Sequence, residues 1–311
     1  MKHKMLVVTI LVYILCLIFV ILGYNRYQTY KLSLNKVVNL VFTTDKNYKD
    51  YLMVTLNSAV KNKAEDSIYN INILCVDLSP KEMAKYQKYN MKNVNIKTIP
   101  LKVATLNGVG DFEVKNDVTR ADLFKFYMPD LFPDLDKILY IDVDTIILKD
   151  LRELYNTNLG NKYIGVVNKT VRDKRTIPLP FGHALVGPVR AYNCGVILYN
   201  LKLWRKHNIT QKLINEKNKD TERELMTQNA FNIVITQRHI KKLSPIYNYN
   251  SSWTSIQFVL NEFKKVYKPY LKNINTIDEL FDNTVILHYA GDYKPWNNNE
   301  VFHGEVWKQY K

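Results

Sequence analysis

Cysteine is scarce in this sequence: only Cys16, Cys75 and Cys194 occur among its 311 residues. Their spacing matches no metal-binding pattern and gives no indication of a disulfide framework. Two glycine-rich phosphate-binding motifs are absent as well, because the chain contains neither Gly-x-Gly-x-x-Gly nor Gly-x-x-x-x-Gly-Lys. A dinucleotide-binding or P-loop site would therefore lack its phosphate cradle.

Long runs of basic residues are also missing, although the formal net charge is +15. Such a charge would suit a nucleic-acid-binding protein. Lys and Arg are scattered, however, with no basic run longer than two residues and no nucleic-acid-binding motif. We therefore expect no nucleic-acid partner, since anionic membranes or phosphorylated ligands explain the charge equally well.

The one long uncharged, mostly apolar run is at the amino terminus, at residues 5–23. It is long enough to cross a hydrocarbon core of roughly 30 Å. A basic tail, residues 1–4, precedes the run, and no small-x-small cleavage site follows it. This pattern predicts a single-pass transmembrane signal anchor, then a short stem at residues 24–36. Positive charges on both sides of the run leave its orientation open.

Two carboxylates, Asp142 and Asp144, interrupt the apolar stretch from Lys137 to Leu148. Residues 138–141 before them have the composition of a strand buried on both faces, where a charge is costly unless it is paired or bound to a metal. Alternation along an extended chain directs both carboxylates to one side and Val143 to the other. An Asp-x-Asp pattern alone is also common in loops, but two oxygen donors here suit Mn²⁺ or Mg²⁺.

A second polar cluster follows the apolar strand that His288 ends, close to the carboxyl terminus. Imidazole is a common ligand of Mn²⁺-type ions, although a structural role is the simpler reading of a lone histidine. Gly291 lets the backbone approach a bound group, and Lys294 is placed to supply charge to a phosphate. Together with Asp142 and Asp144, His288 completes a predicted metal site.

Alternating strands and helices predict a mostly parallel, doubly wound α/β sheet in one domain, residues 37–311. The first half shows strands separated by helices, with strands expected at 37–43, 71–78, 94–101 and 138–141 and helices at 49–61, from Pro80, and at 120–131. The second half predicts, in order, a strand at 164–167, a loop at 176–188, a strand within 192–201, helices near Trp204 and at 222–235, a strand at 240–243, a helical stretch at 253–270 and a strand at 284–287.

Three motifs resemble the retaining glycosyltransferase family 8, which includes lipopolysaccharide glucosyl- and galactosyltransferases, glycogenin and xylosyltransferases. The first is Leu-Tyr-Ile-Asp-Val-Asp, residues 139–144. The second is Asn-Cys-Gly-Val-Ile-Leu-Tyr-Asn-Leu-Lys-Leu-Trp-Arg, residues 193–205, and the third is His-x-x-Gly-x-x-Lys-Pro-Trp, residues 288–296. They occur in the family's order, and the resemblance covers nearly all of the chain from Val37 onward.

This resemblance implies a GT-A fold, which is Rossmann-like with a mostly parallel mixed sheet flanked by helices. It further implies Mn²⁺-dependent (or Mg²⁺-dependent), retaining transfer of a hexose or pentose from a UDP-sugar to a hydroxyl of a glycan, lipopolysaccharide or glycoprotein. Asp142, Asp144 and His288 would hold the metal, and Gly291 and Lys294 would contact the diphosphate. The other implied donor-binding residues are Thr43, Thr44, Asp45, Asn47, Tyr48, Arg120, Lys125 and Val143. The implied catalytic residues are Asn193, beside the transferred sugar, Gln228 and Lys125.

The sequence departs from the family pattern at two places. Lys125 replaces the Arg usually found four residues before Pro129 and loses its bidentate geometry, so Arg120 is a rival for the donor contact. Thr227-Gln228-Asn229 replaces an Asp-Gln-Asp found in many members. Because an amide is a poor nucleophile, we favour front-side attack assisted by the leaving phosphate over attack by Gln228.

Two alternative functions are compatible with the same residues. A metal-dependent phosphohydrolase or nucleotidyltransferase would share the aspartates but commonly needs a second ion. A membrane-tethered, non-catalytic sugar-nucleotide-binding protein would explain the missing acids on either side of Gln228. The predicted domain would face the cytoplasm in a bacterial enzyme and the ER or Golgi lumen in a eukaryotic one.

Overall fold

The computed structural model describes residues 12–24, 26, 34–106, 108–109, 120–171, 175–179, 182–186, 189–219, 227–253, 270–271, 273–298 and 300–311, with only the backbone for those within 169–190. The chain divides into two compact units, Met1–Lys36 and Val37–Lys311.

In the first unit, residues 12–24 are helical. Over the described part of the chain, no helix is both long enough and apolar enough to cross a membrane. The predicted anchor begins with residues 5–11, which lie outside the described residues, as does most of the predicted stem. The transmembrane helix of the predicted fold is therefore unsupported by the structure.

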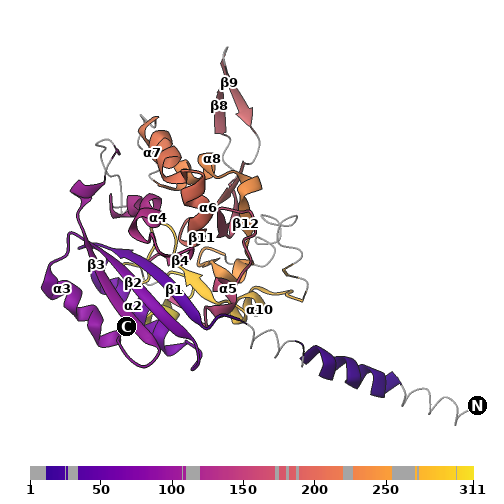
Figure 1. The fold of residues 1–311 in the computed structure, drawn as a ribbon. Coiled ribbons are helices and arrows are strands. Elements are labelled where there is room, and N and C mark those ends of the chain that lie inside the picture. The colour runs from indigo at the N-terminus through magenta and orange to yellow at the C-terminus, as the bar shows by residue number, and fades with distance from the viewer. Residues whose placement is uncertain are drawn as a thin grey trace, which may run out of the picture. The chain divides into compact units, whose positions relative to one another are not determined.

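The second unit is organised around a seven-stranded mixed sheet (Figure 1). Its strand order is β12 (Ile240–Lys242), β6 (Ile164–Val166), β11 (Val196–Asn200), β4 (Lys137–Ile141), β1 (Val37–Thr44), β2 (Ile68–Val76) and β3 (Val94–Leu101). Strands β3, β2, β1 and β4 are parallel, whereas β11 is antiparallel to both of its neighbours. The predicted mostly parallel α/β sheet is confirmed.

Both faces of this sheet are buried, as the apolar composition of its strands predicts. In β4, Leu139 and Ile141 enter one hydrophobic cluster, and Ile138 and Tyr140 enter the other. Helices lie on the two sides (Figure 1). They are α2 (Lys49–Lys61), α3 (Pro80–Ala84), α4 (Met128–Leu131), α5 (Arg152–Tyr155), α6 (Leu201–Lys206), α7 (Ile209–Lys219), α8 (Thr227–Val234), α10 (Ile277–Asp282) and α11 (Gly304–Lys308), with 3₁₀ helices η1 (Lys85–Tyr89), η2 (Val103–Thr105), η3 (Arg120–Tyr127), η4 (Gln237–His239) and η5 (Pro245–Tyr247).

A smaller, three-stranded sheet joins the middle of the chain to its carboxyl-terminal part. Its order is β13 (Tyr249–Asn250), β14 (Ile286–His288) and β5 (Thr145–Ile147). Strand β14 is antiparallel to β5 and pairs His288 with Thr145. This pairing carries the histidine to the segment that contains both aspartates. A two-stranded ribbon of β7 (Asn168–Val171) and β10 (Val189–Tyr192) lies between β6 and β11 in the sequence.

The structure corrects two expectations about local structure. The predicted loop at 176–188 contains an antiparallel pair, β8 (Arg175–Leu179) and β9 (Gly182–Val186). Both strands of a two-stranded ribbon are edge strands, in which proline is tolerated. Pro178 can therefore lie in a strand, and proline did not indicate a loop here. The predicted helix at 120–131 is mostly 3₁₀, and residues 222–226 and 254–269 of two other predicted helices lie outside the described part.

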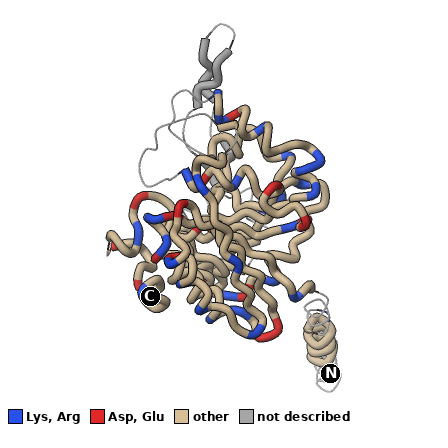
Figure 2. The backbone as a smooth tube through the Cα atoms, turned by 60° about the vertical axis from the view of Figure 1, so that its left-hand side comes forward, with Lys and Arg blue, Asp and Glu red and all other residues tan. Residues whose placement is uncertain are grey.

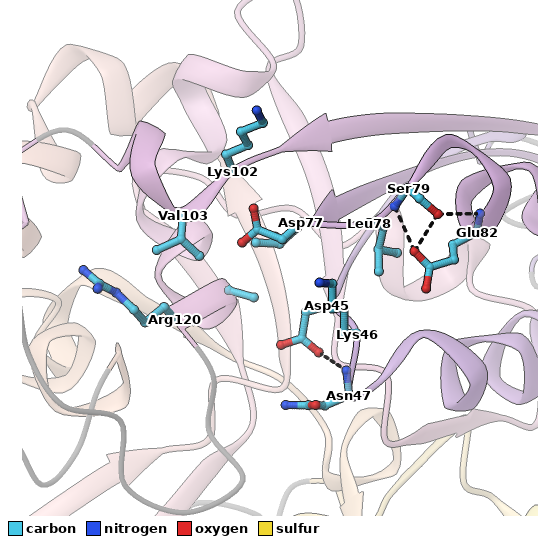
Figure 3. Close-up of a pocket in the computed structure, with 12 residues that line it drawn as sticks. Asp45, Lys46, Asn47, Asp77, Leu78, Ser79, Glu82, Lys102, Val103 and Arg120 are labelled. Atoms are coloured by element: carbon cyan, nitrogen blue, oxygen red, sulfur yellow. Dashed lines mark hydrogen bonds between the residues drawn. The ribbon is translucent and has the colours of Figure 1, made fainter.

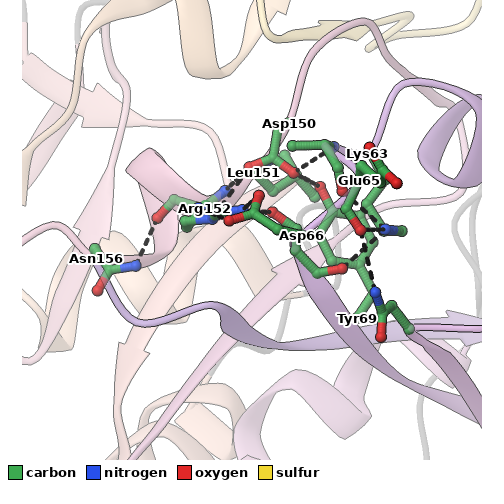
Figure 4. Close-up of polar contacts among 11 residues, drawn as sticks. Lys63, Glu65, Asp66, Tyr69, Asp150, Leu151, Arg152 and Asn156 are labelled. Carbon is green, nitrogen blue, oxygen red and sulfur yellow. Dashed lines mark hydrogen bonds and ion pairs between the residues drawn. The ribbon is translucent and has the colours of Figure 1, made fainter. Parts of the chain in front are cut away.

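A polar network secures the amino end of β2, opposite the carboxyl ends of the parallel strands (Figure 4). Arg152 donates to Asp66 Oδ2 at 3.2 Å and to Ser67 Oγ at 3.0 Å. Asp150 Oδ2 accepts from the Tyr69 hydroxyl at 3.1 Å. This cluster joins β2 to α5, and we interpret it as structural because both of its carboxylates are already paired. Lys and Arg elsewhere are spread over many elements (Figure 2).

Candidate functional site

Asp142 and Asp144 lie in the short connection between β4 and β5, and His288 ends β14. One ligand atom from each of the three lies within 4.8 Å of the others. Among the described residues this is the one group of three or more His, Cys, Asp or Glu side chains close enough to share a metal ion. Asp144 and His288 are buried, while Asp142 is half-buried. The structure thus brings together the three predicted ligands.

Hydrogen bonds to the backbone of the aspartate segment hold this segment in place. The Thr55 hydroxyl of α2 lies 2.7 Å from the Val143 carbonyl and 2.9 Å from that of Thr145. The Asp142 amide donates to the Gly195 carbonyl at 2.7 Å. The Val143 side chain is buried in the core on the α2 side. Its implied donor contact is therefore limited to the backbone.

Asp144 lies between two nitrogen groups from the carboxyl-terminal part of the chain. Its Oδ1 is 3.1 Å from His288 Nε2, and its Oδ2 accepts from Lys294 Nζ at 2.5 Å. Lys294 also donates to the Tyr289 carbonyl at 2.7 Å. Burial opposes ionisation of Asp144, but His288 and Lys294 hold the pKa of this carboxyl well below its ordinary value. Asp144 is therefore ionised, as a metal ligand must be.

Asp142 contacts a different set of groups, from the opposite face of the sheet. The Tyr140 hydroxyl donates to its Oδ1 at 2.7 Å, and Lys125 Nζ lies 3.0 Å from the same oxygen. Burial raises the pKa of Asp142, and Lys125 opposes that rise. Lys125 is also paired with Asp122. Although burial alone would lower the pKa of Lys125, the two aspartates raise it well above its ordinary value, so the ammonium stays charged.

Asp122 is a site residue that the sequence did not reveal. Its Oδ2 accepts a hydrogen bond from the Thr227 hydroxyl, across 105 positions in the sequence. Many members of the family that this chain resembles carry an acid at the position of Thr227. This chain has a hydroxyl there, and the hydroxyl contacts the Asp122 carboxylate of η3. No local pattern around Asp122 marks it, so only the tertiary structure identifies it.

The side-chain amides of Asn193 and Gln228, two of the implied catalytic residues, lie next to each other. Asn193 Nδ2 lies 3.4 Å from Gln228 Oε1, and Asn193 Oδ1 accepts from the Gly195 amide at 2.8 Å. Gln228 follows Thr227, the first residue of α8, which places these amides beside the Asp122–Lys125 pair. Asn232 supports this arrangement because its Nδ2 donates to the Gln228 carbonyl at 2.8 Å.

Gly195, the residue directly before β11, lies against the ring of His288. A Cβ atom built on it would lie 2.2 Å from His288 Cε1, where no other atom fits. This explains physically why glycine follows Asn193-Cys194. Gly291 has a φ of +99°, a backbone conformation that favours glycine, and the space around its missing Cβ is open.

A cavity of about 1250 Å³ opens at the carboxyl ends of β1 and β2 (Figure 3). It exceeds the roughly 300–1,000 Å³ typical of small-molecule sites and so has room for a small-molecule ligand. Among the residues that line it are Asp45, Asn47 and Arg120, three of the implied donor-binding residues. Asp45 Oδ1 accepts from the Asn47 amide at 2.9 Å and orders the turn before α2. The carboxyl-end position is where ligands bind in open α/β sheets.

Three other implied donor-binding residues, Thr43, Thr44 and Tyr48, are not among those that line this cavity, and neither are Lys125, Val143, Gly291, Lys294 and the three metal-ligand candidates. Thr43 and Thr44 are buried in β1, and the Tyr48 ring packs edge-on against Trp296 with centroids 6.3 Å apart. The Thr43 hydroxyl is buried and has no hydrogen-bond partner among the described residues. The donor contacts of Thr43, Thr44 and Tyr48 therefore stay a prediction.

Comparison with known proteins agrees with this geometry. General stress protein A of Bacillus subtilis is 21% identical over 270 residues, covering 85% of this chain and 89% of that protein. Glycosyltransferase GlyE of Streptococcus pneumoniae is 30% identical over 188 residues, covering 60% of this chain and 40% of GlyE. The crystal structure of galactosyltransferase LgtC, in complex with donor and acceptor sugar analogues, superposes with a TM-score of 0.66 at 20% identity, over 88% of this chain and 95% of LgtC.

The similarity to solved structures shows that the chain has a GT-A-like fold. The match of its sequence to a family model identifies the family. The family model described as glycosyl transferase family 8 matches residues 39–300, which include both aspartates, His288 and Lys294. With that match over most of its length, the chain is a glycosyltransferase that belongs to glycosyl transferase family 8.

Proposed function

We propose that this protein is a metal-dependent retaining glycosyltransferase that moves glucose, galactose or xylose from a UDP-sugar to a hydroxyl of a glycan or glycoconjugate. The observation that carries the proposal is the convergence of Asp142, Asp144 and His288, with Lys125 and Lys294 in contact with the two aspartates. A nucleotide-sized cavity at the adjoining strand ends supports it.

The three ligand candidates fit a divalent cation such as Mn²⁺ or Mg²⁺. Two carboxylates and one imidazole suit Mn²⁺ well, and three protein ligands leave positions open for substrate oxygens. His288 Nε2 and Asp144 Oδ1 face each other at 3.1 Å, so two atoms that can each coordinate a cation lie close together. When bound, the cation would supply charge neutralisation for the diphosphate that leaves.

The protein's own groups would bind and orient the donor. The cavity beside Asp45, Asn47 and Arg120 would take the nucleoside. Lys294 and Lys125, both buried ammonium groups, would add positive charge where negative charge develops on the departing diphosphate. Binding of this kind stabilises the transition state without a protein nucleophile.

We infer front-side attack by the acceptor hydroxyl. Asn193 and Gln228 offer amides, which are poor nucleophiles. The carboxylate of Asp122 belongs to the same cluster, and it is occupied by Lys125 and the Thr227 hydroxyl. In such a mechanism the leaving phosphate accepts the proton of the acceptor hydroxyl, and the new glycosidic bond forms on the same face of the sugar.

The test is to incubate the purified protein with UDP-glucose, UDP-galactose and UDP-xylose, each with and without Mn²⁺. We expect slow Mn²⁺-dependent hydrolysis of one donor even without acceptor. Binding of UDP-sugars without any turnover would instead indicate a sugar-nucleotide-binding protein. A second tightly held metal beside Asp142 would indicate a phosphohydrolase or nucleotidyltransferase.

A further inference from the structure

Asn248 lies directly behind His288, and we propose that it is a positioning residue that keeps a proton on His288 Nδ1 and so turns the Nε2 lone pair toward the metal. Asn248 is buried, and its Oδ1 lies 2.8 Å from His288 Nδ1. Its Nδ2 lies 3.0 Å from Asn193 Oδ1. The inference rests on the proposed function insofar as the triad is taken to bind a divalent cation.

The orientation of both amides follows from one backbone group. The Gly195 N–H is only a donor, so the Asn193 atom that faces it at 2.8 Å must be the carbonyl oxygen. The Asn248 atom that faces this oxygen must then be its NH₂ nitrogen. The other end of the Asn248 amide, which faces His288 Nδ1, is therefore an oxygen that accepts.

An accepting oxygen at Nδ1 determines the state of the imidazole ring. A neutral histidine has one N–H and one lone pair, so a proton on Nδ1 leaves the lone pair on Nε2. Nε2 is the atom that faces Asp144 Oδ1 at 3.1 Å. The reverse tautomer would require Asn248 to turn its amide over and to place its oxygen against Asn193 Oδ1. That arrangement brings two acceptors together and is unfavourable.

The same contacts give Asn193 a second role, which is to hold the Asn248 amide in this orientation. Its carbonyl oxygen is shared by Gly195 and Asn248, and only its NH₂ group lies near Gln228. Groups that hold the second nitrogen of a metal-bound histidine fix the ring's tautomer and orientation. Removing such a group typically weakens metal binding about 10- to 100-fold.

The first test detects which ring nitrogen of His288 carries a proton, and it needs neither a metal nor catalytic turnover. Nitrogen-15 NMR of the histidines in the metal-free protein should show a proton on His288 Nδ1, whether or not Nε2 also carries a proton toward Asp144. In Asn248→Ala the Nδ1 preference should be reduced or lost. A His288 Nδ1 found without a proton in the wild-type protein would overturn the proposal, whatever the variants do.

The second test measures Mn²⁺ affinity by electron paramagnetic resonance in three proteins, namely wild type, Asn248→Ala and a control variant. We expect Asn248→Ala to bind Mn²⁺ about 10- to 100-fold more weakly than wild type. Asn250→Ala is the matched control from the adjoining strand β13, and its affinity should be unchanged.

The possible failures are distinguishable. If wild type binds Mn²⁺ and Asn248→Ala binds it equally well, this inference is wrong while the proposed function stands. If wild type binds no Mn²⁺, the proposed function is wrong, and the NMR result alone decides the role of Asn248.

Discussion

Replacing Gly195 by Ala should disable the metal site through a single added methyl group. Its carbon would lie 2.2 Å from His288 Cε1, whereas carbon atoms not bonded to each other rarely approach within 3.0 Å. The ring or the strand must therefore move by 3.0 − 2.2 = 0.8 Å or more. The strand is restrained because the Gly195 carbonyl accepts from the Asp142 amide at 2.7 Å. We therefore expect the His288 ring to move away from Asp144.

The expected cost has two parts. Overpacking of this kind reduces the free energy of unfolding by about 1–3 kcal/mol. Displacement of a metal ligand should weaken Mn²⁺ binding by on the order of 100-fold, the upper end of the effect seen when ligand orientation is disturbed. Chemical denaturation measures the first, and electron paramagnetic resonance of Mn²⁺ measures the second.

Gly165→Ala is the matched control. Gly165 lies in β6 of the same sheet, and a Cβ there would lie 3.1 Å from the end of the flexible Leu159 side chain, in the core. This variant should lose some stability and keep its Mn²⁺ affinity. If Gly195→Ala binds Mn²⁺ as wild type does, the close approach between β11 and His288 is not what holds the ring, and the reasoning fails.

Three further expectations concern charge and packing. Lys294→Ala should weaken binding of UDP more than binding of uridine, measured by calorimetry, because the lost charge serves the diphosphate; equal losses would remove that role. The folded-state pKa of Asp144 is lowered, so its ionisation stabilises the fold above the ordinary pKa of about 4 and that contribution is lost as pH falls further. Urea unfolding of the metal-free protein should therefore show a steeper loss of stability below about pH 4 in wild type than in Asp144→Asn, and identical acid profiles would contradict this. Trp204→Phe should lower the free energy of unfolding by about 1–3 kcal/mol by removing a buried indole and its 3.0 Å hydrogen bond to Thr210, with Mn²⁺ affinity unchanged.

Local patterns were sufficient to predict much of the fold. Strand β3 and helix α2 have the predicted bounds because turn residues and hydrophobic periodicity change sharply at their ends. The meeting of Asp142, Asp144 and His288 was also predictable. Each motif ends an apolar strand, where ligands of α/β proteins bind, although the two strands lie in different sheets and the pairing of β14 with β5 brings their ends together.

The residues that the sequence did not reveal are those whose roles depend on contacts between distant segments. Asn248 is 40 positions from His288, and Asp122 is 105 positions from Thr227. Asparagine and aspartate are common in this chain, so neither residue has a distinguishing local signal. The antiparallel direction of β11 was likewise undetermined, because an apolar run does not specify the direction in which a strand pairs.

The most direct measurement of the shared metal site is UDP binding by calorimetry, with and without Mn²⁺, for wild type, Asp144→Ala and His288→Ala. We predict that wild type binds UDP far more tightly when Mn²⁺ is present, and that each variant loses this dependence. Unchanged dependence on Mn²⁺ in both variants would contradict the account, because the cation would then be held by residues other than this triad.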